Sequence, residues 1–336
     1  MTRNHYWRLD QHPVGHDFAS ALSLQEETPA PLAEGEVRIA VDYLSMDAGT
    51  RLWMTGRTDG YQPPLPLGAR MVGLVLGRVV ESRDAAFAVG DLVRGFGQWA
   101  TLATVVPAMA GLEKLDDSVP DIRQHFGTLG LNAWTAYIGV VDVAQLLAGQ
   151  WLAVSAAAGS TGLMACQIAR QLGAKVVAIA GGERKCRYLR EELGVDLALD
   201  YRKDDVAARL QAIDGGLSAY FDNVGGPLLD AVLPAMAHYG RIAICGMVAG
   251  YDGDRPLPGP ARFDQILMRR LRVEGFFIPD NLARGESFPQ VLRDWAMDGT
   301  LTMPFDQSEG IEQVLTAYGR MMSGANIGKT IVKVSA

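Results

Sequence analysis

The sequence predicts an α/β protein in which a doubly wound parallel sheet accompanies a mostly β domain. Its length of 336 residues favours two domains. Short apolar runs between glycines and prolines fill the first third of the chain, whereas apolar strands and helices alternate from about residue 122 onward. Such alternation is typical of a parallel sheet covered by helices on both faces.

Four strands are expected in the N-terminal part of the chain. Each is an apolar run bounded by glycine or proline, and they cover residues 36–46, 71–82, 90–97 and 99–107. Their apolar–polar alternation is imperfect, so their ends are less well defined than their existence. Together they predict an all-β or barrel-like unit.

The alternating part of the chain begins with a segment of helical character at 125–147. Strands are then expected at 151–157, 175–180, 197–201, 219–226, 240–247 and from 271, with helices at 162–172, 183–194, 204–213, 228–237 and 287–297. The tail returns to a helix at 310–324 and a final strand at 328–334. The predicted domains are 1–123 plus 307–336 for the β part and 124–306 for the parallel sheet.

Composition excludes several classes of protein. The formal net charge of −7 favours solubility and argues against a nucleic-acid partner. The N-terminus lacks the apolar core of a secretory signal, and no run of 18 residues resembles a membrane span. Cys166, Cys186 and Cys245 are widely spaced and suit a reducing cytoplasm. We therefore expect a cytoplasmic protein that acts on a small molecule.

A glycine loop between residues 157 and 162 predicts a dinucleotide site. The pattern is Ala157-x-Gly159-x-x-Gly162, preceded by an apolar strand and followed by an apolar helix and a second strand. Gly159 stands where backbone must approach a pyrophosphate, and Gly162 where helix and strand pack closely. Ala157 replaces the first glycine of the fingerprint. A strand-turn-helix motif built only for packing is the alternative interpretation.

The end of the second strand indicates which dinucleotide is preferred. NAD enzymes place a carboxylate there to bind the ribose 2′-hydroxyl, whereas NADP enzymes need a cation. Here the strand ends "IAGG", and Arg184 and Lys185 follow within one turn. Glu183 is the opposing observation, although a glutamate in a first helical turn commonly stabilises the helix N-terminus. The pattern favours NADPH.

The chain resembles the zinc-independent medium-chain dehydrogenase/reductases, and within them the leukotriene B4 dehydrogenase, prostaglandin reductase and plant double-bond reductase group. The motifs that carry the resemblance span nearly the whole chain: "YLSMD", "YQPPLPLG", "VGDLVRG", "AAAGSTG", "AIAGGERKCRYLREELGVDLALDY", "YFDNVGG", "GRIAICGM", "EGFFI" and "GANIGKTIVKV". The resemblance implies a GroES-like catalytic domain that is completed by the C-terminal strands and carries an inserted Rossmann domain.

The resemblance also implies roles for individual residues. It implies cofactor contacts from Thr135, Gly159, Ser160, Thr161, Gly162, Lys185, Tyr201, Asn223, Cys245, Gly246, Met247, Val248, Phe276, Phe277, Ile278 and Asn326. Lys185 and Tyr201 would lie near the 2′-phosphate. Asn223 could instead serve only a turn, and Phe276 and Phe277 could be strand core. Tyr251 matches the tyrosine proposed as the donor in double-bond reductases, or it only lines the pocket.

A zinc mechanism is not expected. Zinc alcohol dehydrogenases need a Cys/His ligand set, but the first 165 residues contain no cysteine. Ala69 and Arg70 stand where a zinc enzyme would carry His-Glu. We therefore predict no metal site, which removes the usual electrophile for alcohol oxidation.

The predicted reaction is NADPH-dependent reduction of the C=C bond of an α,β-unsaturated ketone or aldehyde, because conjugation already activates such an acceptor for hydride transfer to its β-carbon. An NADPH:quinone oxidoreductase and a non-catalytic NADPH-binding sensor remain alternatives. The chain departs from the family at Ala48, where a proline is usual, and at Asn132-Ala133, where many relatives have Pro-Gly. These departures leave the substrate open. The family and two apolar strands near one sheet edge favour a homodimer.

Overall fold

The computed structural model describes residues 3–60, 63–252 and 257–334. It divides into unit 1, which comprises residues 1–126, 251–254 and 305–336, and unit 2, which comprises 127–250 and 255–304. The domain limits expected at 123/124 and 306/307 stay a prediction. Tyr61 and Gln62 of the "YQPPLPLG" motif lie outside the described residues, as do Gly253 and Asp254.

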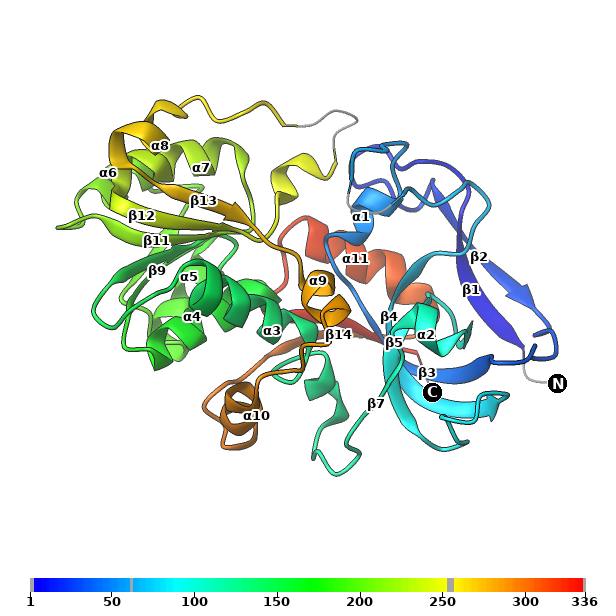
Figure 1. Ribbon diagram of the computed structural model, residues 1–336. Coiled ribbons are helices and arrows are strands. Elements are labelled where there is room, and N and C mark those ends of the chain that lie inside the picture. The colour runs from blue at the N-terminus through cyan, green and yellow to red at the C-terminus, as the bar shows by residue number, and fades with distance from the viewer. Residues whose placement is uncertain (1–2, 61–62, 253–256, 335–336) are drawn as a thin grey trace. The chain divides into compact units, whose positions relative to one another are not determined.

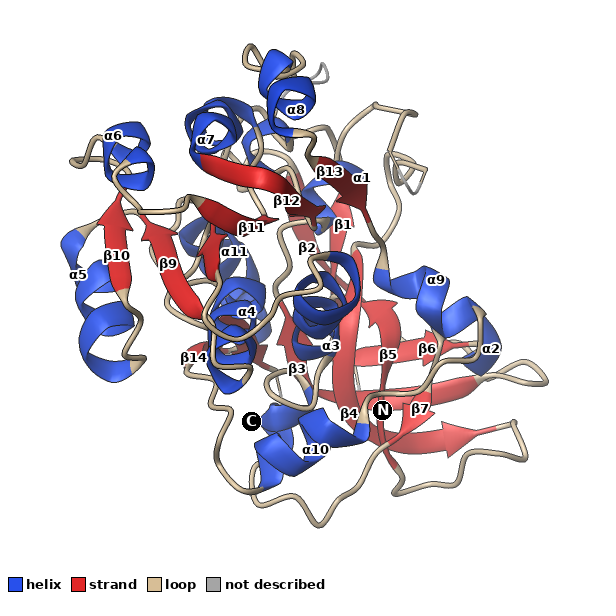
Figure 2. Ribbon diagram, turned by 60° about the vertical axis from the view of Figure 1, so that its left-hand side comes forward, coloured by secondary structure: helices blue, strands red, loops and turns tan. Residues whose placement is uncertain are grey.

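Unit 1 is built on a seven-stranded sheet (Figure 2). Six of its strands follow the order β14-β15-β3-β4-β5-β7, and the seventh, β6, pairs with β3. The strands are β3 (Val37–Ser45), β4 (Val72–Ser82), β5 (Leu92–Gln98), β6 (Leu102–Val105), β7 (Glu113–Lys114), β14 (Phe305–Glu309) and β15 (Lys329–Lys333). The four strands predicted in this part of the chain are confirmed. Val332 of β15 pairs with Leu44 of β3, so the end of the chain completes the sheet.

Further short elements surround this sheet. They are the hairpin of β1 (Asn4–Leu9) and β2 (Leu22–Glu27), the helices α1 (Thr50–Trp53), α2 (Pro107–Ala110) and α11 (Val314–Met322), and the 3-10 turns η1 (Ile122–His125) and η6 (Ile311–Gln313). Aromatic rings from these elements and from the segments between the strands pack together in the core of unit 1. The Tyr318 ring of α11 packs edge-on against Phe18 and Trp99, with centroids 4.8 and 5.3 Å away.

Unit 2 is a six-stranded parallel sheet with the order β10-β9-β8-β11-β12-β13. The strands are β8 (Trp151–Val154), β9 (Lys175–Ala180), β10 (Leu197–Asp200), β11 (Leu217–Asp222), β12 (Met236–Ile244) and β13 (Arg272–Gly275). The order reverses beside β8, as in a doubly wound sheet. The predicted fold class is confirmed.

Helices cover both faces of this sheet (Figure 1). One face carries α3 (Leu131–Tyr137), η2 (Ile138–Val143), α4 (Ser160–Gln171), α5 (Glu183–Arg187) and η3 (Tyr188–Glu192); the other carries α6 (Val206–Gln211), α7 (Gly226–Val232), η4 (Leu233–Ala235) and α8 (Asp264–Arg269). After β13 follow α9 (Ile278–Ala283) and α10 (Gln290–Met297). No helix in the described ranges is long and apolar enough to cross a membrane.

Some element ends differ from the predicted ones, for local reasons. The helix predicted at 228–237 stops at Ala235, because Pro234 lies in its final 3-10 turn and strand β12 begins at Met236. The strand predicted from residue 271 ends at Gly275, because Pro279 opens α9. Strand β8 ends at Val154, three residues before the predicted end, because the chain turns into the glycine loop there.

Candidate cofactor and active site

The glycine loop joins β8 to α4 through close backbone contacts. The Ala157 N–H donates to the Ile179 carbonyl of β9 (3.0 Å), and the Gly159 N–H closes a turn on Ala156 O (2.9 Å). A Cβ at Gly162 would lie 2.4 Å from Ala156 O and 2.8 Å from Ala157 Cα. Gly162 therefore lets the first turn of α4 pack on the loop, as the sequence predicts.

Strain in this loop lies one residue before the replaced glycine. Ala156 has a φ of +47°, in the left-handed region that costs an L-residue about 1–2 kcal/mol. Ala157, at the first position of the fingerprint, is not among the residues with positive φ. Alanine is therefore tolerated at 157, and the residue whose conformation would favour glycine is Ala156.

Helix α3 contributes a hydrogen bond to the same loop. The Asn132 side-chain amide donates to Thr161 Oγ1 (2.9 Å). The Thr135 hydroxyl donates to the Leu131 carbonyl within the helix (2.7 Å). Asn132, one of the departures from the family pattern, thus orients the Thr161 hydroxyl.

A buried carboxylate organises the ends of β8, β11 and β12. Asp222 is fully buried, and its Oδ1 accepts hydrogen bonds from Ser155 Oγ (3.1 Å), Tyr220 Oη (2.9 Å) and the backbone N–H groups of Val224 and Gly225 (2.9 Å each). Asn223 donates its backbone N–H to Ser155 Oγ (2.8 Å) and its side-chain amide to Ser155 O (2.7 Å). The sequence indicated Asn223 but not its partner Ser155. Asp222, directly before Asn223, was the signal that could have indicated this network.

The turn after β12 is tied to the same strand ends. The N–H groups of Cys245 and Gly246 donate to Asp222 O (2.8 and 3.0 Å), and the Val248 N–H donates to Asn223 O (3.2 Å). Three of the predicted cofactor segments, at 159–162, 223 and 245–248, therefore meet at the carboxyl edge of the sheet, where ligands of such sheets bind.

The cysteines are expected to be unreactive at neutral pH. Burial, and then the Asp222 charge, raises the pKa of Cys245 to about 12; burial raises the pKa of Cys166 to about 12 as well. At pH 8 only about 10⁻⁴ of such a thiol is thiolate. Labelling of the native protein by a thiol reagent should therefore be slow and quicken about tenfold per pH unit.

Labelling in denaturant provides the control for this prediction. All three cysteines should then react rapidly, because their pKa values return to about 8.5. Fast labelling of Cys245 in the native protein at pH 8 would contradict the expectation.

At the ends of β9 and β10 lies a second cluster, beside Gly181. A Cβ there would lie 2.8 Å from Tyr201 Cε1 and 2.9 Å from Arg202 Nε. Both side chains are exposed, and Arg202 forms no ion pair with any described residue. The sequence pattern indicated Tyr201 but not Arg202, although Arg202 is the next residue in the turn that follows β10.

Asp200 holds this cluster in place from beneath. The carboxylate is buried, and its Oδ1 accepts the backbone N–H groups of Gly182 (2.8 Å) and Arg202 (3.1 Å). The Gly182 N–H holds the pKa of Asp200 below its usual range. Asp200 therefore stays ionised near neutral pH and fixes the turn that carries Arg202.

Lys185 lies in the first turn of α5, which begins directly after Gly182, and Glu183 is engaged elsewhere. The Glu183 carboxylate accepts a hydrogen bond from Arg190 Nη2 (2.6 Å), two turns further along the chain. Lys185 is half-buried. The carboxylate that opposed an NADPH preference in the sequence is thus paired within its own helix.

Phe276 packs against the sheet. Its ring lies edge-on to Phe221, with centroids 6.1 Å apart, and a Cβ at Gly139 would collide with both rings. Phe276, Phe277 and Ile278 are half-buried; the two phenylalanines lie between β13 and α9, and Ile278 begins α9. Core packing accounts for the Phe276 ring, while the neighbouring backbone follows the carboxyl end of β13.

Two predicted site residues belong to unit 1. Asn326 is buried, and its amide donates to Gly328 O (3.0 Å) just before β15. Tyr251 is half-buried and follows Gly250, where the chain passes from unit 2 into unit 1. The structure thus describes every predicted site residue.

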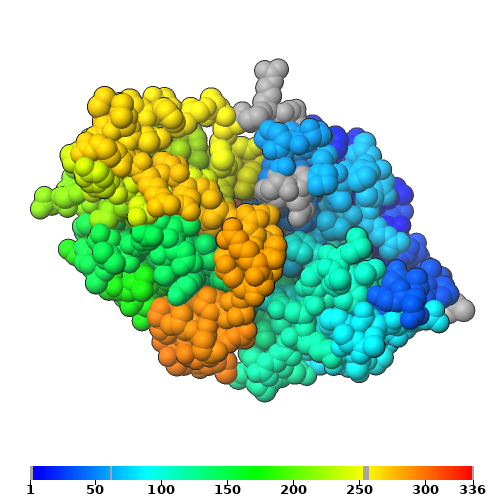
Figure 3. Space-filling model, viewed as in Figure 1, coloured from blue at the N-terminus to red at the C-terminus, as the bar shows by residue number. Residues whose placement is uncertain are grey.

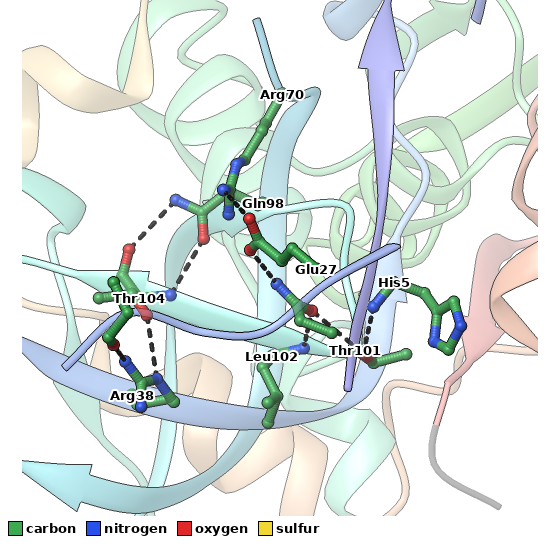
Figure 4. Close-up of polar contacts among 10 residues, drawn as sticks. His5, Glu27, Arg38, Arg70, Gln98, Thr101, Leu102 and Thr104 are labelled. Atoms are coloured by element: carbon green, nitrogen blue, oxygen red, sulfur yellow. Dashed lines mark hydrogen bonds and ion pairs between the residues drawn. The ribbon is translucent and has the colours of Figure 1, made fainter. Parts of the chain in front are cut away.

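Arg70 lies in unit 1, in the strand environment shown in Figure 4. Its guanidinium donates to Glu27 (2.5 Å) and lies 4.3 Å from the centroid of the Tyr6 ring. Asn4 donates to the other Glu27 oxygen (2.9 Å). Arg70 is thus held by a carboxylate and an aromatic ring of the β1–β2 hairpin. Within the described part of the chain, no three His, Cys, Asp or Glu residues are grouped to hold a metal.

The residues of unit 2 fit a dinucleotide phosphate. The tight glycine loop leads into the N-terminus of α4, whose backbone N–H groups can bind a phosphate, and the cations Lys185 and Arg202 can bind a further phosphate. Known families match both parts of the chain. A family model described as the N-terminal domain of oxidoreductase matches residues 5–115, and one described as zinc-binding dehydrogenase matches residues 160–296.

Whole-length relatives are similar as well. The chain is 34% identical to the NADPH-dependent curcumin reductase of Escherichia coli (strain K12), over 99% of this chain and 97% of that protein. It is 35% identical to prostaglandin reductase 1 of Mus musculus, over 99% and 100%. The crystal structure of CurA in complex with NADPH from Vibrio vulnificus superposes with a TM-score of 0.90 at 30% identity, covering 99% of both chains.

Proposed function

We propose that this chain, which belongs to the zinc-independent medium-chain dehydrogenase/reductase family, reduces the C=C bond of α,β-unsaturated ketones and aldehydes. It is an NADP-dependent oxidoreductase, and its cofactor is NADP(H). The observation that carries the substrate proposal is its whole-length similarity to reductases named for curcumin and prostaglandin.

We propose that the segments at the carboxyl edge of the sheet hold the cofactor. Gly159, Ser160, Thr161 and Gly162 would cradle the pyrophosphate at the N-terminus of α4, while Asn223, the 245–248 turn and the 276–278 segment would follow the nicotinamide half. Thr135 and Asn326 would add contacts from α3 and from the segment before β15. The hydrogen bonds that Asp222 and Ser155 make to these turns support a preorganised site.

We assign the 2′-phosphate to Lys185, Tyr201 and Arg202. Two cations and a phenol can bind an anion of about two charges, and Glu183 is paired with Arg190. Asp200 is buried and bound to backbone N–H groups, so it serves the turn. These contacts support a preference for NADPH over NADH.

Substitution tests this assignment. Lys185→Ala and Arg202→Ala should each raise the Kd for NADPH about 10-fold, since each removes one charge-assisted contact worth about 1.5–3 kcal/mol before solvent screening. The Kd for NADH should hardly change. Fluorescence titration with both cofactors measures the two values.

Lys175→Ala is the matched control, because it removes the same charge. Lys175 starts β9, at the opposite end from Gly181, with its Nζ 5.4 Å from the centroid of the Trp151 ring. An equal loss of NADPH affinity in Lys175→Ala would contradict a specific role of Lys185 and Arg202. An equal loss of NADPH and NADH affinity in Lys185→Ala or Arg202→Ala would contradict it as well.

The chemistry requires little from the protein beyond orientation and a donor. When bound, the reduced nicotinamide supplies a hydride, which a conjugated acceptor takes at its β-carbon. We propose that Tyr251 donates a hydrogen bond to the carbonyl oxygen, where the enolate charge develops. A proton from solvent then adds to the α-carbon and completes the saturated product.

Spectrophotometry of NADPH oxidation tests the function. The purified chain should oxidise NADPH when an enal or an enone is the acceptor. With the same acceptors, it should oxidise NADH more slowly. Turnover of quinones alone would indicate an NADPH:quinone oxidoreductase, and NADPH binding without any turnover would indicate a sensor.

We also propose a cytoplasmic homodimer. Strand β13 is the outer strand of the parallel sheet, and exposed apolar side chains from α8 and β13 lie near it: Leu267 (73% exposed), Met268 (58%) and Val273 (42%). Figure 3 shows this yellow-to-orange stretch at the surface of unit 2. An unpaired edge with apolar neighbours supports pairing across a two-fold axis.

A further inference from the structure

Asp252, the residue after Tyr251, is bound on both carboxylate oxygens by side chains of unit 1. Its Oδ1 accepts a hydrogen bond from Arg51 Nε (3.0 Å), and its Oδ2 lies 2.7 Å from His16 Nε2. Both partners are far away in the sequence. The segment that carries Tyr251 is therefore held at its next residue by two contacts.

Arg51 is buried, with 2% of its surface exposed, on the short helix α1. Its Nη2 donates to the carbonyls of Pro13 (2.9 Å) and Gly15 (3.4 Å), and Asp252 is the one carboxylate among the described residues that pairs with it. Its Nη1 is buried without a hydrogen-bond partner in the described chain. Since a buried charge without a counter-ion is costly, Arg51 strongly favours a conformation that keeps Asp252 beside it.

The other end of the network rests on the core. The His16 ring is stacked on Phe18, with centroids 6.0 Å apart and an interplanar angle of 16°. Phe18 is 2% exposed and packs edge-on against Tyr318. The second contact of Asp252 is thus made by a ring whose own position is fixed.

Helix α1 is fixed as well. The ammonium of Lys329, which is 1% exposed, donates to Asp47 Oδ1 (2.5 Å) and to Met46 O (3.3 Å). The Thr50 N–H closes a turn on Asp47 O (3.1 Å) at the start of the helix. Arg51 therefore projects from a turn that strand β15 holds.

We propose that Arg51 and Asp252 are positioning residues for Tyr251. Through the ion pair, the β-rich unit fixes the backbone beside the tyrosine. The tyrosine hydroxyl then stays within hydrogen-bonding distance of the substrate carbonyl oxygen. This inference rests on the proposed donor role of Tyr251. Misplacement of a catalytic group by about 1 Å can cost on the order of 100-fold in rate.

Asp252→Ala is the first test, with Asp252→Asn as the conservative variant. Asp252→Ala should lower kcat for an enone about 10-fold at saturating NADPH, because the tyrosine becomes less well placed. Asp252→Asn keeps an acceptor for Arg51 and should recover part of that loss. The Kd for NADPH should not change in either variant.

Glu113→Ala is a matched control within the same unit. Arg94 is 5% exposed, its Nε donates to Glu113 Oε1 (2.7 Å), and its Nη1 donates to the His125 carbonyl. Glu113→Ala thus removes the carboxylate that another buried arginine binds through its Nε. We expect Glu113→Ala to lower the Tm much as Asp252→Ala does, but to leave kcat unchanged.

Two further measurements separate positioning from stability. In a Tyr251→Phe background, Asp252→Ala should cause no further loss of kcat. Hydrogen exchange of the peptide that contains Tyr251 should be faster in Asp252→Ala than in Glu113→Ala. Equal kcat in Asp252→Ala and wild type, a second tenfold loss in the Tyr251→Phe background, or unchanged exchange would each overturn the inference.

The exchange measurement also stands if the proposed function is wrong. A wild-type chain that reduces no enone or enal would contradict the proposed function. Faster exchange at the Tyr251 peptide would then still support the fixing of that segment by Arg51 and Asp252, and unchanged exchange would refute it.

Discussion

Gly162→Ala is expected to weaken NADPH binding by about 100-fold or more. The added Cβ would lie 2.4 Å from Ala156 O and 2.8 Å from Ala157 Cα, which are backbone atoms that cannot yield as a side-chain tip can. Helix α4 must then move away from the loop and carry its N–H groups with it. Losing one or two charge-assisted contacts of about 1.5–3 kcal/mol each corresponds to that factor.

The same variant should lower the free energy of unfolding by about 1–3 kcal/mol, as overpacking does. Gly319→Ala is the control, because a Cβ there, in α11, meets no atom within 4 Å. Gly319→Ala should keep both its Tm and its NADPH affinity. Titration and thermal unfolding of the two variants decide the matter: wild-type affinity in Gly162→Ala would show that the loop does not bind the pyrophosphate.

Tyr251→Phe is expected to lower kcat for enones on the order of 100-fold, because one donor to the developing enolate oxygen is lost. The Kd for NADPH should stay the same, since the phenol is not assigned to the cofactor. Quinone reduction, which needs no such donor, should continue if the chain has that activity. Steady-state kinetics with an enone and a quinone measure both effects.

Tyr43→Phe controls for the general loss of a phenol from unit 1, because Tyr43 is a half-buried tyrosine in β3 without an assigned role. It should keep wild-type kinetics. Enone reduction at the wild-type rate by Tyr251→Phe would show that Tyr251 only lines the pocket.

Local patterns in the sequence were sufficient to predict the parallel sheet and the glycine loop. Buried strands such as β9 are nearly continuous apolar runs, because both of their faces are covered. Gly162 was identifiable because the helix must approach the strand closely. The positive φ of Ala156 had no signal in the sequence, where only the replacement of a glycine by Ala157 stood out.

Other features depend on contacts that no local pattern encodes. The β1–β2 hairpin escaped prediction because charged residues interrupt its alternation and only four of its twelve residues are fully buried. Arg51 and Asp252 are 201 positions apart, so their pairing could not be inferred from spacing. Arg202 follows β10, and its closeness to the end of β9 depends on the parallel pairing of these two strands, which no local pattern encodes.

The pairing of β15 with β3 has a consequence for synthesis on the ribosome. Leu44 pairs with Val332, which is synthesised about 290 residues later. At usual translation rates of about 5–20 residues per second, synthesis of the intervening chain takes roughly 15–60 s. During that time β3 lacks its β15 neighbour, while most of unit 2 has already emerged and can fold. Nascent chains stalled before residue 329 should therefore carry an exposed strand edge, the kind of surface that chaperones protect from aggregation.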